Sequence, residues 1–234
     1  PATARVVVIG AGIVGNSLVH HLARLGWRDI VQIDKGPLPN PGGSTGHASN
    51  FIFPVDHSRE ITDLTLDSMA QYKEMGVFIE SGGFEIARTE ERMEELRRRM
   101  SSAKAWGIES ELVTPEQVKE KVPFIETDQF IGAFWTPSVG VVDSLRAGTI
   151  MREKALELGA LTTVPNVEVL GIDVEDGRVT RVRTNQGDVE TDTVVVACGV
   201  WSPRIAEMAG AHIPLTPAVH QMISVGPCPQ QSGL

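Results

Sequence analysis

The first fifty residues combine two short apolar runs with a helical repeat between them. The runs are Val6–Ile9 and Ile30–Ile33, and each has the length and composition of a buried strand. The apolar positions between them recur at helical spacing: Val14, Leu18, Leu22 and Leu25. Gly26 is placed to end this helix in a left-handed conformation. The pattern therefore predicts a β-α-β unit at the start of the chain.

From residue 51 the pattern changes to amphipathic helices with short strands between them. One helical stripe closes at Gly82-Gly83 and has these apolar positions: Ile61, Leu64, Met69, Tyr72, Met75 and Ile79. Phe84–Ala87 indicates a strand, and a second amphipathic helix begins after Thr89. Its apolar positions are Met93, Leu96, Met100, Ala103 and Trp106. Thr114–Gln117 combines an N-cap, a proline in the first position and a glutamine in the third, which predicts a short helix.

The second half of the chain predicts one long helix and a β-meander. A strand from Phe130 to Trp135 precedes a helix from Ser144 to Leu158. Three alternating segments follow, with turns at Asp176-Gly177 and Asn185–Gly187 between them. These segments are Val167 to Asp173, Val179 to Thr184 and Val189 onward. They predict a three-strand meander.

The last elements complete an α/β fold. Asp192–Gly199 contains an unbroken apolar run that suits a strand buried on both faces of a parallel sheet. A short helix from Ser202 to Gly210 and a strand from Ala218 to Val225 follow. We expect a Rossmann-like dinucleotide-binding domain with a three-strand β-meander, interrupted by part of an α+β domain. The first domain would comprise residues 1–50 and 140–213, and the second 51–139 and 214–234.

The junction after the first strand carries a motif that binds dinucleotides. Gly10, Gly12 and Gly15 form G-x-G-x-x-G between a strand and a helix. In this context the first glycine makes the tight turn, the second lies under the pyrophosphate and the third packs the helix on the sheet. Asp34 ends the second strand and is the carboxylate expected to bind the ribose hydroxyls. This complete context favours a dinucleotide over the alternative of a glycine-rich turn with a capping aspartate, but it does not separate NAD from FAD.

Composition and charge narrow the class of protein. A formal charge of −9 gives no basic field, so we expect neither a nucleic-acid partner nor an acidic membrane. Cys198 and Cys228 lack the spacing of a metal site, which indicates a reducing compartment and no metal. No apolar run approaches the length of a membrane span, and we expect a soluble, cytoplasmic protein. A start at Pro1 and a loop-like end favour the N-terminal part of a longer polypeptide. Three tryptophans are expected in the core: Trp106, Trp135 and Trp201.

Several segments occur in the order of a known family's landmarks. They are the glycine motif at 10–15, Gly42–Ala48, Gly82–Ala87, Ala105–Ile108, Ala197–Gly199 and Pro217–Gln221. Together they resemble the dimethylglycine oxidase, dimethylglycine dehydrogenase and sarcosine dehydrogenase family. The resemblance implies an FAD-binding domain and hydride transfer from an N-methyl carbon of a small amino acid, dimethylglycine or sarcosine, to flavin N5. The product would be an iminium at the oxidation level of formaldehyde.

The resemblance also implies partners for this reaction. Oxygen or an electron-transfer protein would reoxidise the flavin, and tetrahydrofolate takes the one-carbon unit in relatives that have a further C-terminal domain. A eukaryotic relative would be found in the mitochondrial matrix. Two alternatives stay open: a non-catalytic regulatory homologue of the same fold, and a nicotinamide-dependent dehydrogenase.

Individual site residues follow from the same resemblance. His47 matches the histidine that is covalently bonded to the flavin 8α carbon, and its alternative is a loop histidine that binds its own backbone. His220 matches an active-site histidine that would accept the amine proton, and its alternative is a histidine with local hydrogen bonds alone. Further residues expected to line the FAD are Ile13, Val14, Asp34, Lys35, Ser44, Thr45, Gly46, Phe51 and Val169.

Overall fold

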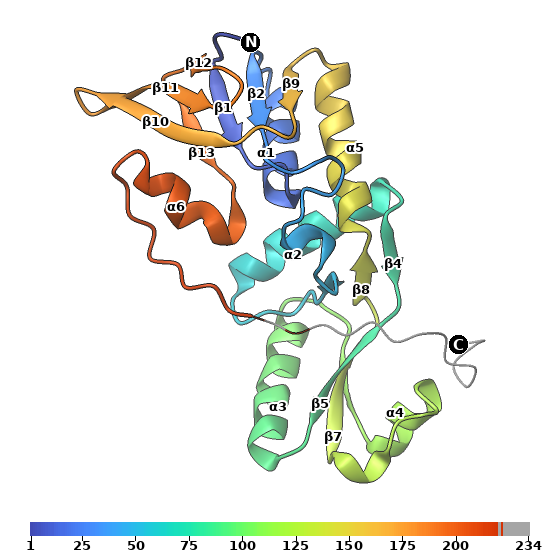
Figure 1. Ribbon diagram of the computed structural model, residues 1–234. Coiled ribbons are helices and arrows are strands. Elements are labelled where there is room, and N and C mark those ends of the chain that lie inside the picture. Colours follow the sequence, from blue (N-terminus) through green and yellow to red (C-terminus); the bar gives the residue numbers. More distant parts are fainter. Residues whose placement is uncertain (220, 222–234) are drawn as a thin grey trace. The chain divides into compact units, whose positions relative to one another are not determined.

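The computed structural model describes residues 1–219 and 221 of the 234 (Figure 1). Its contacts divide the chain into two compact units. Of the described residues, one unit comprises 1–48 together with those from Ser144 to the end of the described chain, and the other comprises Ser49–Asp143. This division does not show which unit binds a ligand. The predicted domain bounds, and the predicted FAD-binding and substrate roles of the two domains, stay predictions.

The first unit is built on a parallel sheet whose strand order is β13-β1-β2-β9. The strands are β1 (Val6–Ile9), β2 (Ile30–Ile33), β9 (Leu161–Val164) and β13 (Val194–Val196). The predicted pairing of the late apolar run in a parallel sheet is confirmed, because Val194 lies opposite Val7. This strand is only half-buried, since its one neighbour among the described strands is β1.

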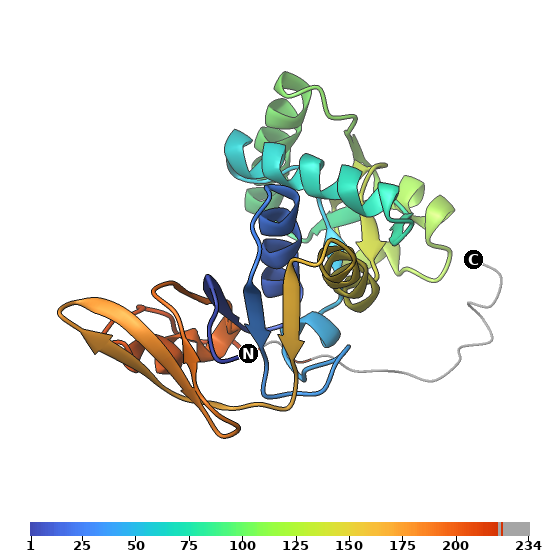
Figure 2. The same cartoon turned by 90° about the horizontal axis from the view of Figure 1, so that it is seen from above.

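Side chains of β1 point alternately to the two faces of this sheet. Val6 and Val8 pack against two helices, α1 (Ile13–Arg24) and α5 (Ser144–Glu157). Val7 and Ile9 pack under the meander, which consists of β10 (Val169–Glu175), β11 (Arg178–Thr184) and β12 (Val189–Glu190). Figure 2 shows the meander and α5 on opposite sides of the sheet. A short 3-10 helix, η3 (Gly199–Trp201), and helix α6 (Ser202–Glu207) follow β13.

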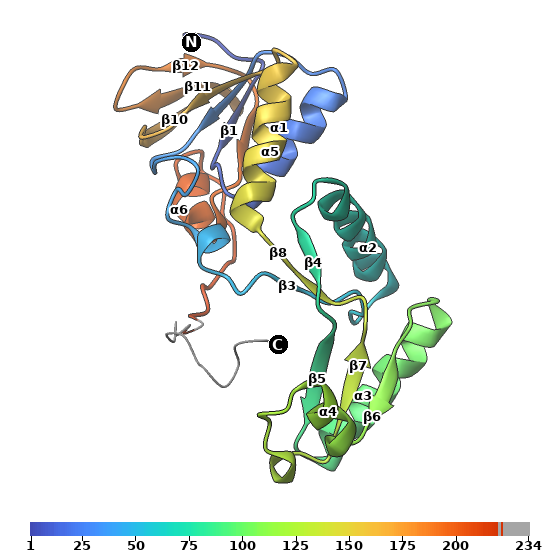
Figure 3. The same cartoon turned by 90° about the vertical axis from the view of Figure 1, so that its right-hand side faces the viewer.

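The second unit contains two small antiparallel sheets and three helices (Figure 3). One sheet has the order β3-β8-β4, with strands Phe51–Ile52, Gly140–Val142 and Phe78–Glu80. The other has the order β5-β7-β6, with strands Gly83–Ala87, Gly132–Thr136 and Glu111–Val113. The helices are α2 (Arg59–Glu74), α3 (Glu90–Ala105) and α4 (Pro115–Lys121), and a 3-10 turn, η2, covers Thr127–Gln129.

Local capping signals give the helix starts correctly. The Thr89 hydroxyl accepts the N–H of Arg92 and begins α3, as predicted. The Thr114 hydroxyl accepts the N–H of Gln117, whose side chain binds the Thr114 N–H in return, so the predicted capping box is present.

The predicted end of the first long stripe is wrong. Helix α2 ends at Glu74, and Gly76 adopts the left-handed region at φ +69°. Ile79 therefore belongs to β4 instead of the helix, and its side chain is 71% exposed. The spacing from Met75 to Ile79 imitates a helical turn, but the glycine between them closes the helix first.

Most of the predicted strand from Ala218 to Val225 lies outside the described residues. Ala218 and Val219 have no regular structure. Gln221 likewise has no regular structure, and His220 and residues 222–225 lie outside the described residues.

Candidate functional site

The glycine turn after β1 is the centre of the candidate site. Gly10 has φ +113°, and a Cβ there would lie 2.3 Å from the carbonyl oxygen of Ala197. A Cβ on Gly15 would lie 2.0 Å from the carbonyl oxygen of Gly10. Gly12 is the N-cap of α1 and makes no side-chain cap. The first turn of α1 therefore approaches the Gly10 turn closely, because none of the three glycines has a side chain to separate them, and such a turn is typical of a pyrophosphate site.

Asp34 joins this turn to the loop that follows β2. Its Oδ2 accepts the N–H of Ala11 at 2.7 Å, and its Oδ1 accepts the N–H of Gly36 at 2.8 Å. The carboxylate thus holds two backbone segments beside the turn. Each carboxylate oxygen keeps a further lone pair that these bonds do not use and that could accept from a ribose hydroxyl. The contact with the ribose stays a prediction.

Two buried amides that the sequence analysis did not single out support the same turn. Gln32, fully buried in β2, donates from Nε2 to the carbonyl oxygen of Gly10 at 3.2 Å and to Asn16 Oδ1 at 3.1 Å. Asn16, in the first turns of α1, donates from Nδ2 to the carbonyl oxygen of Ala11 at 2.9 Å. A glutamine inside an apolar strand was the signal that could have revealed this network, since a buried amide needs partners.

The loop at residues 42–48, here called the His47 loop, contains the 3-10 turn η1 (Ser44–Gly46) and is hydrogen-bonded to α1. The Thr45 hydroxyl accepts the N–H of Ile13, the first residue of α1, at 2.9 Å. The Thr45 carbonyl accepts the hydroxyl of Ser144 at 2.6 Å. A Cβ on Gly46 would lie 2.7 Å from the Asn40 side chain, so this glycine is tightly packed. Ser44 is exposed.

His47 is exposed and its ring orientation is fixed by one hydrogen bond. Nδ1 lies 2.9 Å from the carbonyl oxygen of Gly43. A carbonyl can only accept, so Nδ1 is the donor, and the neutral tautomer compatible with this bond has its lone pair on Nε2. This is the backbone contact expected of an ordinary loop histidine, and it involves Nδ1 and not Nε2.

Cys198 follows the end of β13, next to the end of β1 where the glycine turn begins. Its Sγ donates to the carbonyl oxygen of Ile9 at 3.2 Å. Burial, followed by the negative charge of Asp34, raises the pKa of the Cys198 thiol from 9.0 to about 11. The thiol therefore stays protonated at neutral pH and acts as a hydrogen-bond donor.

We predict slow alkylation of Cys198. With a pKa of about 11, its thiolate fraction at pH 8.5 falls roughly a hundredfold below that of an ordinary thiol. Iodoacetamide labelling followed by peptide mass spectrometry measures the rate, in a Cys228→Ser background, against labelling in denaturant. Because the folded-state pKa is raised, the thiol's contribution to stability is present below pH 9 and is lost between pH 9 and 11. Equal labelling rates in the folded and denatured protein would contradict the prediction.

Two large apolar side chains of the first unit are exposed, and the prediction for one of them, Trp201, is wrong. Trp201 was expected in the core, but it is 54% exposed, and its ring comes within 3.6 Å of where a Cβ on Gly43 would be. The side chain of Val14 is 67% exposed. Trp106 and Trp135 are partly buried and pack against core clusters, as expected.

Three further predicted cofactor residues lie outside the glycine turn and the His47 loop in sequence. Lys35 is exposed and forms an ion pair with Glu168 at 3.7 Å. Val169 is 7% exposed, and its side chain packs in the core beneath the meander. Phe51 belongs to the second unit, where it is 50% exposed and stacks on Phe53. His220 cannot be placed, because it lies outside the described residues.

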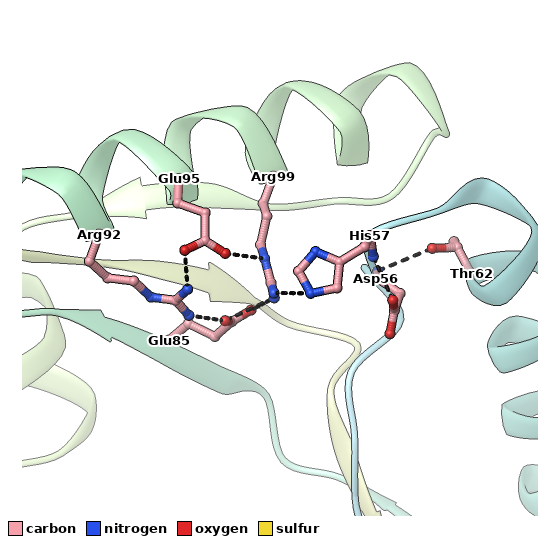
Figure 4. Close-up of polar contacts among 7 residues, drawn as sticks. All are labelled: Asp56, His57, Thr62, Glu85, Arg92, Glu95 and Arg99. Carbon is pink, nitrogen blue, oxygen red and sulfur yellow. Dashed lines mark hydrogen bonds and ion pairs between the residues drawn. The ribbon is translucent and has the colours of Figure 1, made fainter. Parts of the chain in front are cut away.

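The second unit has a polar cluster of its own (Figure 4). Glu85 accepts hydrogen bonds from Arg92 and Arg99, each at 2.7 Å, and Glu95 pairs with the same two arginines. Arg99 also donates to His57 Nε2 at 3.2 Å. Each charge here is matched by an opposite one, so the cluster stabilises the unit and offers no free charge to a substrate.

Within residues 1–219 and 221, no group of three or more His, Cys, Asp or Glu side chains is placed to hold a metal ion. No helix in this part of the chain is long and apolar enough to cross a membrane.

Comparison with known proteins agrees with the dinucleotide-binding role predicted for the glycine turn. A family model described as FAD dependent oxidoreductase (DAO) matches residues 5–234. The chain is 32% identical to mitochondrial sarcosine dehydrogenase of Mus musculus, a match that covers 95% of the chain and 25% of that protein. It is 30% identical to the mitochondrial pyruvate dehydrogenase phosphatase regulatory subunit of Mus musculus, over 86% of the chain and 24% of that protein. The chain thus spans about a quarter of the length of these curated relatives.

A solved structure shares the fold. The L-proline dehydrogenase of P. horikoshii superposes with a TM-score of 0.82 at 30% identity, over 90% of this chain and 56% of that one. The expected α/β architecture with a Rossmann-like nucleotide domain is confirmed by this likeness.

Proposed function

Because this chain belongs to the FAD dependent oxidoreductase (DAO) family, we propose that the whole protein oxidises a small amino acid whose nitrogen carries a methyl group. Dimethylglycine and sarcosine are the substrates we favour. Sarcosine and proline, which appear in the names of two relatives, are both α-amino acids with a secondary amine. The observation that carries the proposal is the His47 loop, whose Thr45 is hydrogen-bonded to the first residue of α1 beside the glycine turn.

The residues of the first unit fit an FAD. The turn at Gly10, Gly12 and Gly15 leaves room for backbone to approach a pyrophosphate, and the N-terminus of α1 favours its negative charge. Asp34 accepts the N–H of Ala11 and Thr45 accepts the N–H of Ile13, the residues before and after Gly12. When bound, FAD supplies an oxidised ring that accepts a hydride from the carbon next to the amine nitrogen.

His47 is the residue we propose for covalent attachment, and Nε2 is the atom. Its Nδ1 is occupied as a donor to Gly43, which leaves the Nε2 lone pair directed away from the loop. An exposed position gives an electrophilic carbon access to that lone pair.

Other parts of the proposal rest on the resemblance alone. His220 would hold the proton that the amine loses before oxidation. Oxygen or an electron-transfer protein would accept the electrons, and a folate domain would belong to another part of the whole protein. A location in the cytoplasm, or in the mitochondrial matrix of a eukaryote, stays a prediction.

Acid precipitation and substrate reduction of the complete protein test this proposal. We expect a yellow pellet from the parent, a colourless pellet from His47→Ala, and bleaching of the flavin by sarcosine or dimethylglycine in the absence of an acceptor. Glycine and trimethylglycine serve as control amines, since the first has no N-methyl group and the second has no lone pair on nitrogen. His220→Ala should slow reduction by about a hundredfold at saturating substrate. A flavin that none of the N-methyl amines bleaches would reject the proposal.

A second candidate is a regulatory protein without catalysis. It is favoured by the 30% identity with the phosphatase regulatory subunit. The same experiment separates the two, because a regulatory protein would leave flavin colour unchanged by every amine. A nicotinamide-dependent dehydrogenase, the third possibility from the sequence, would instead bind NADH and carry no flavin absorbance.

A further inference from the structure

Ser144 is a buried hydroxyl that reaches the candidate site from a distant part of the chain. It is the first residue of α5, and 6% of its surface is exposed. Its Oγ donates to the carbonyl oxygen of Thr45 at 2.6 Å, across 99 positions of sequence. Neither the motifs nor the family resemblance singled out this residue.

The two helices involved form a fixed frame around the loop. Both run antiparallel to the strands of the parallel sheet, since α1 follows β1 and α5 precedes β9. Their N-termini therefore lie at the same edge, where β1 ends. Gly148 lets them approach closely, because a Cβ there would lie 2.8 Å from Asn16 Nδ2.

Thr45 is held by both helices at once. Its hydroxyl accepts from Ile13 of α1 at 2.9 Å and its carbonyl accepts from Ser144 of α5 at 2.6 Å. The first bond fixes the side chain and the second fixes the peptide plane. His47 follows two residues later, and its N–H binds the carbonyl oxygen of Ser44 at 3.1 Å. A rotation of the Thr45 peptide would thus be transmitted to the direction of the imidazole.

We propose that Ser144 is a positioning residue that aims His47 Nε2 for attachment to the flavin. The inference rests on the proposed function. Attachment replaces a hydrogen of the flavin 8α carbon by a bond to Nε2. That hydrogen leaves as a proton, Nδ1 keeps its own, and two electrons pass to oxygen or another acceptor. Ser144 takes no part in these bonds and acts only through the orientation of Thr45.

The test uses the complete protein produced without flavin and then mixed with FAD in air. The covalent fraction is followed by acid precipitation at successive times. Ser144→Ala should attach FAD about tenfold more slowly than the parent, because one buried hydrogen bond that orients the loop is lost. Ser144→Thr keeps the hydroxyl and should recover most of the parental rate. The matched control is Thr149→Ala, which removes a hydroxyl of the same helix that donates to the carbonyl oxygen of Leu145 within α5.

A second measurement does not need the flavin. Hydrogen exchange of the peptide that covers residues 43–48 should be about tenfold faster in Ser144→Ala than in Thr149→Ala. A parent protein that never retains covalent flavin would reject the function proposed for His47, while hydrogen exchange would still report on the Ser144 bond. The positioning role is overturned if Ser144→Ala attaches FAD at the parental rate, if both alanine variants slow it equally, or if exchange at 43–48 is unchanged.

Discussion

Replacement of Gly15 by alanine is expected to destabilise the complete protein by about 3 kcal/mol and to abolish measurable FAD binding. The added Cβ would lie 2.0 Å from the carbonyl oxygen of Gly10 and 3.0 Å from its carbonyl carbon. Both are backbone atoms of the turn itself, so relief requires α1 to move away from β1. Helix propensity acts in the opposite direction, since alanine is favoured over glycine by about 1 kcal/mol inside a helix.

The measurements are urea unfolding and FAD titration of the apoprotein, with Gly26→Ala as the control. Gly26 has φ +88° and open space around its Cβ position, so this control carries the strain of a left-handed residue alone. We expect it to lower the free energy of unfolding by about 1 kcal/mol and to leave FAD affinity unchanged. Stability of Gly15→Ala equal to or above that of the parent would contradict the close approach seen in the structure.

The sequence predicted those parts of the fold whose information is local. The β-α-β unit at the start is encoded by a period of apolar residues and by glycines at fixed offsets. The caps at Thr89 and Thr114 were equally readable, because each bond spans three residues. The helices α3 and α5 followed from their apolar spacing.

The missed strands are those that depend on distant partners. Strand β9 has four residues and only two of them are apolar, so no period distinguishes it. It exists because it pairs in parallel with β2, more than a hundred residues earlier. Strands β4, β6 and β8 have three residues each and likewise acquire their conformation through pairing.

The candidate site shows the same division. Gly10, Gly15 and Asp34 were predicted from a motif and are brought together by the structure. Ser144 was invisible, because no spacing relates residue 144 to residue 45. The exposure of Trp201 was also unpredictable, since a large aromatic residue is more often buried.

Glu85→Gln is expected to lower the free energy of unfolding of the second unit by about 2 kcal/mol. Glu85 is the shared acceptor of Arg92 and Arg99, and its side chain is 15% exposed (Figure 4). The amide keeps the volume but loses the charge, and it replaces one of the two acceptor oxygens by an NH2 donor that faces a guanidinium group. Arg99, whose side chain is 17% exposed, could still donate to the remaining amide oxygen and to His57, but the carboxylate left beside it would be Glu95, at 3.6 Å.

Glu94→Gln is the matched control on α3. Glu94 is 55% exposed and pairs with Arg97 at 3.0 Å, so its loss should cost less than about 0.5 kcal/mol. Urea unfolding at low salt and in 1 M NaCl separates the two cases, because salt screens the exposed pair far more than the half-buried one. The effect of Glu85→Gln should persist in high salt, while that of Glu94→Gln should vanish. Equal losses in the two variants would mean that burial adds nothing to the Glu85 cluster, and that its arginines are as well solvated as those on the open face of α3.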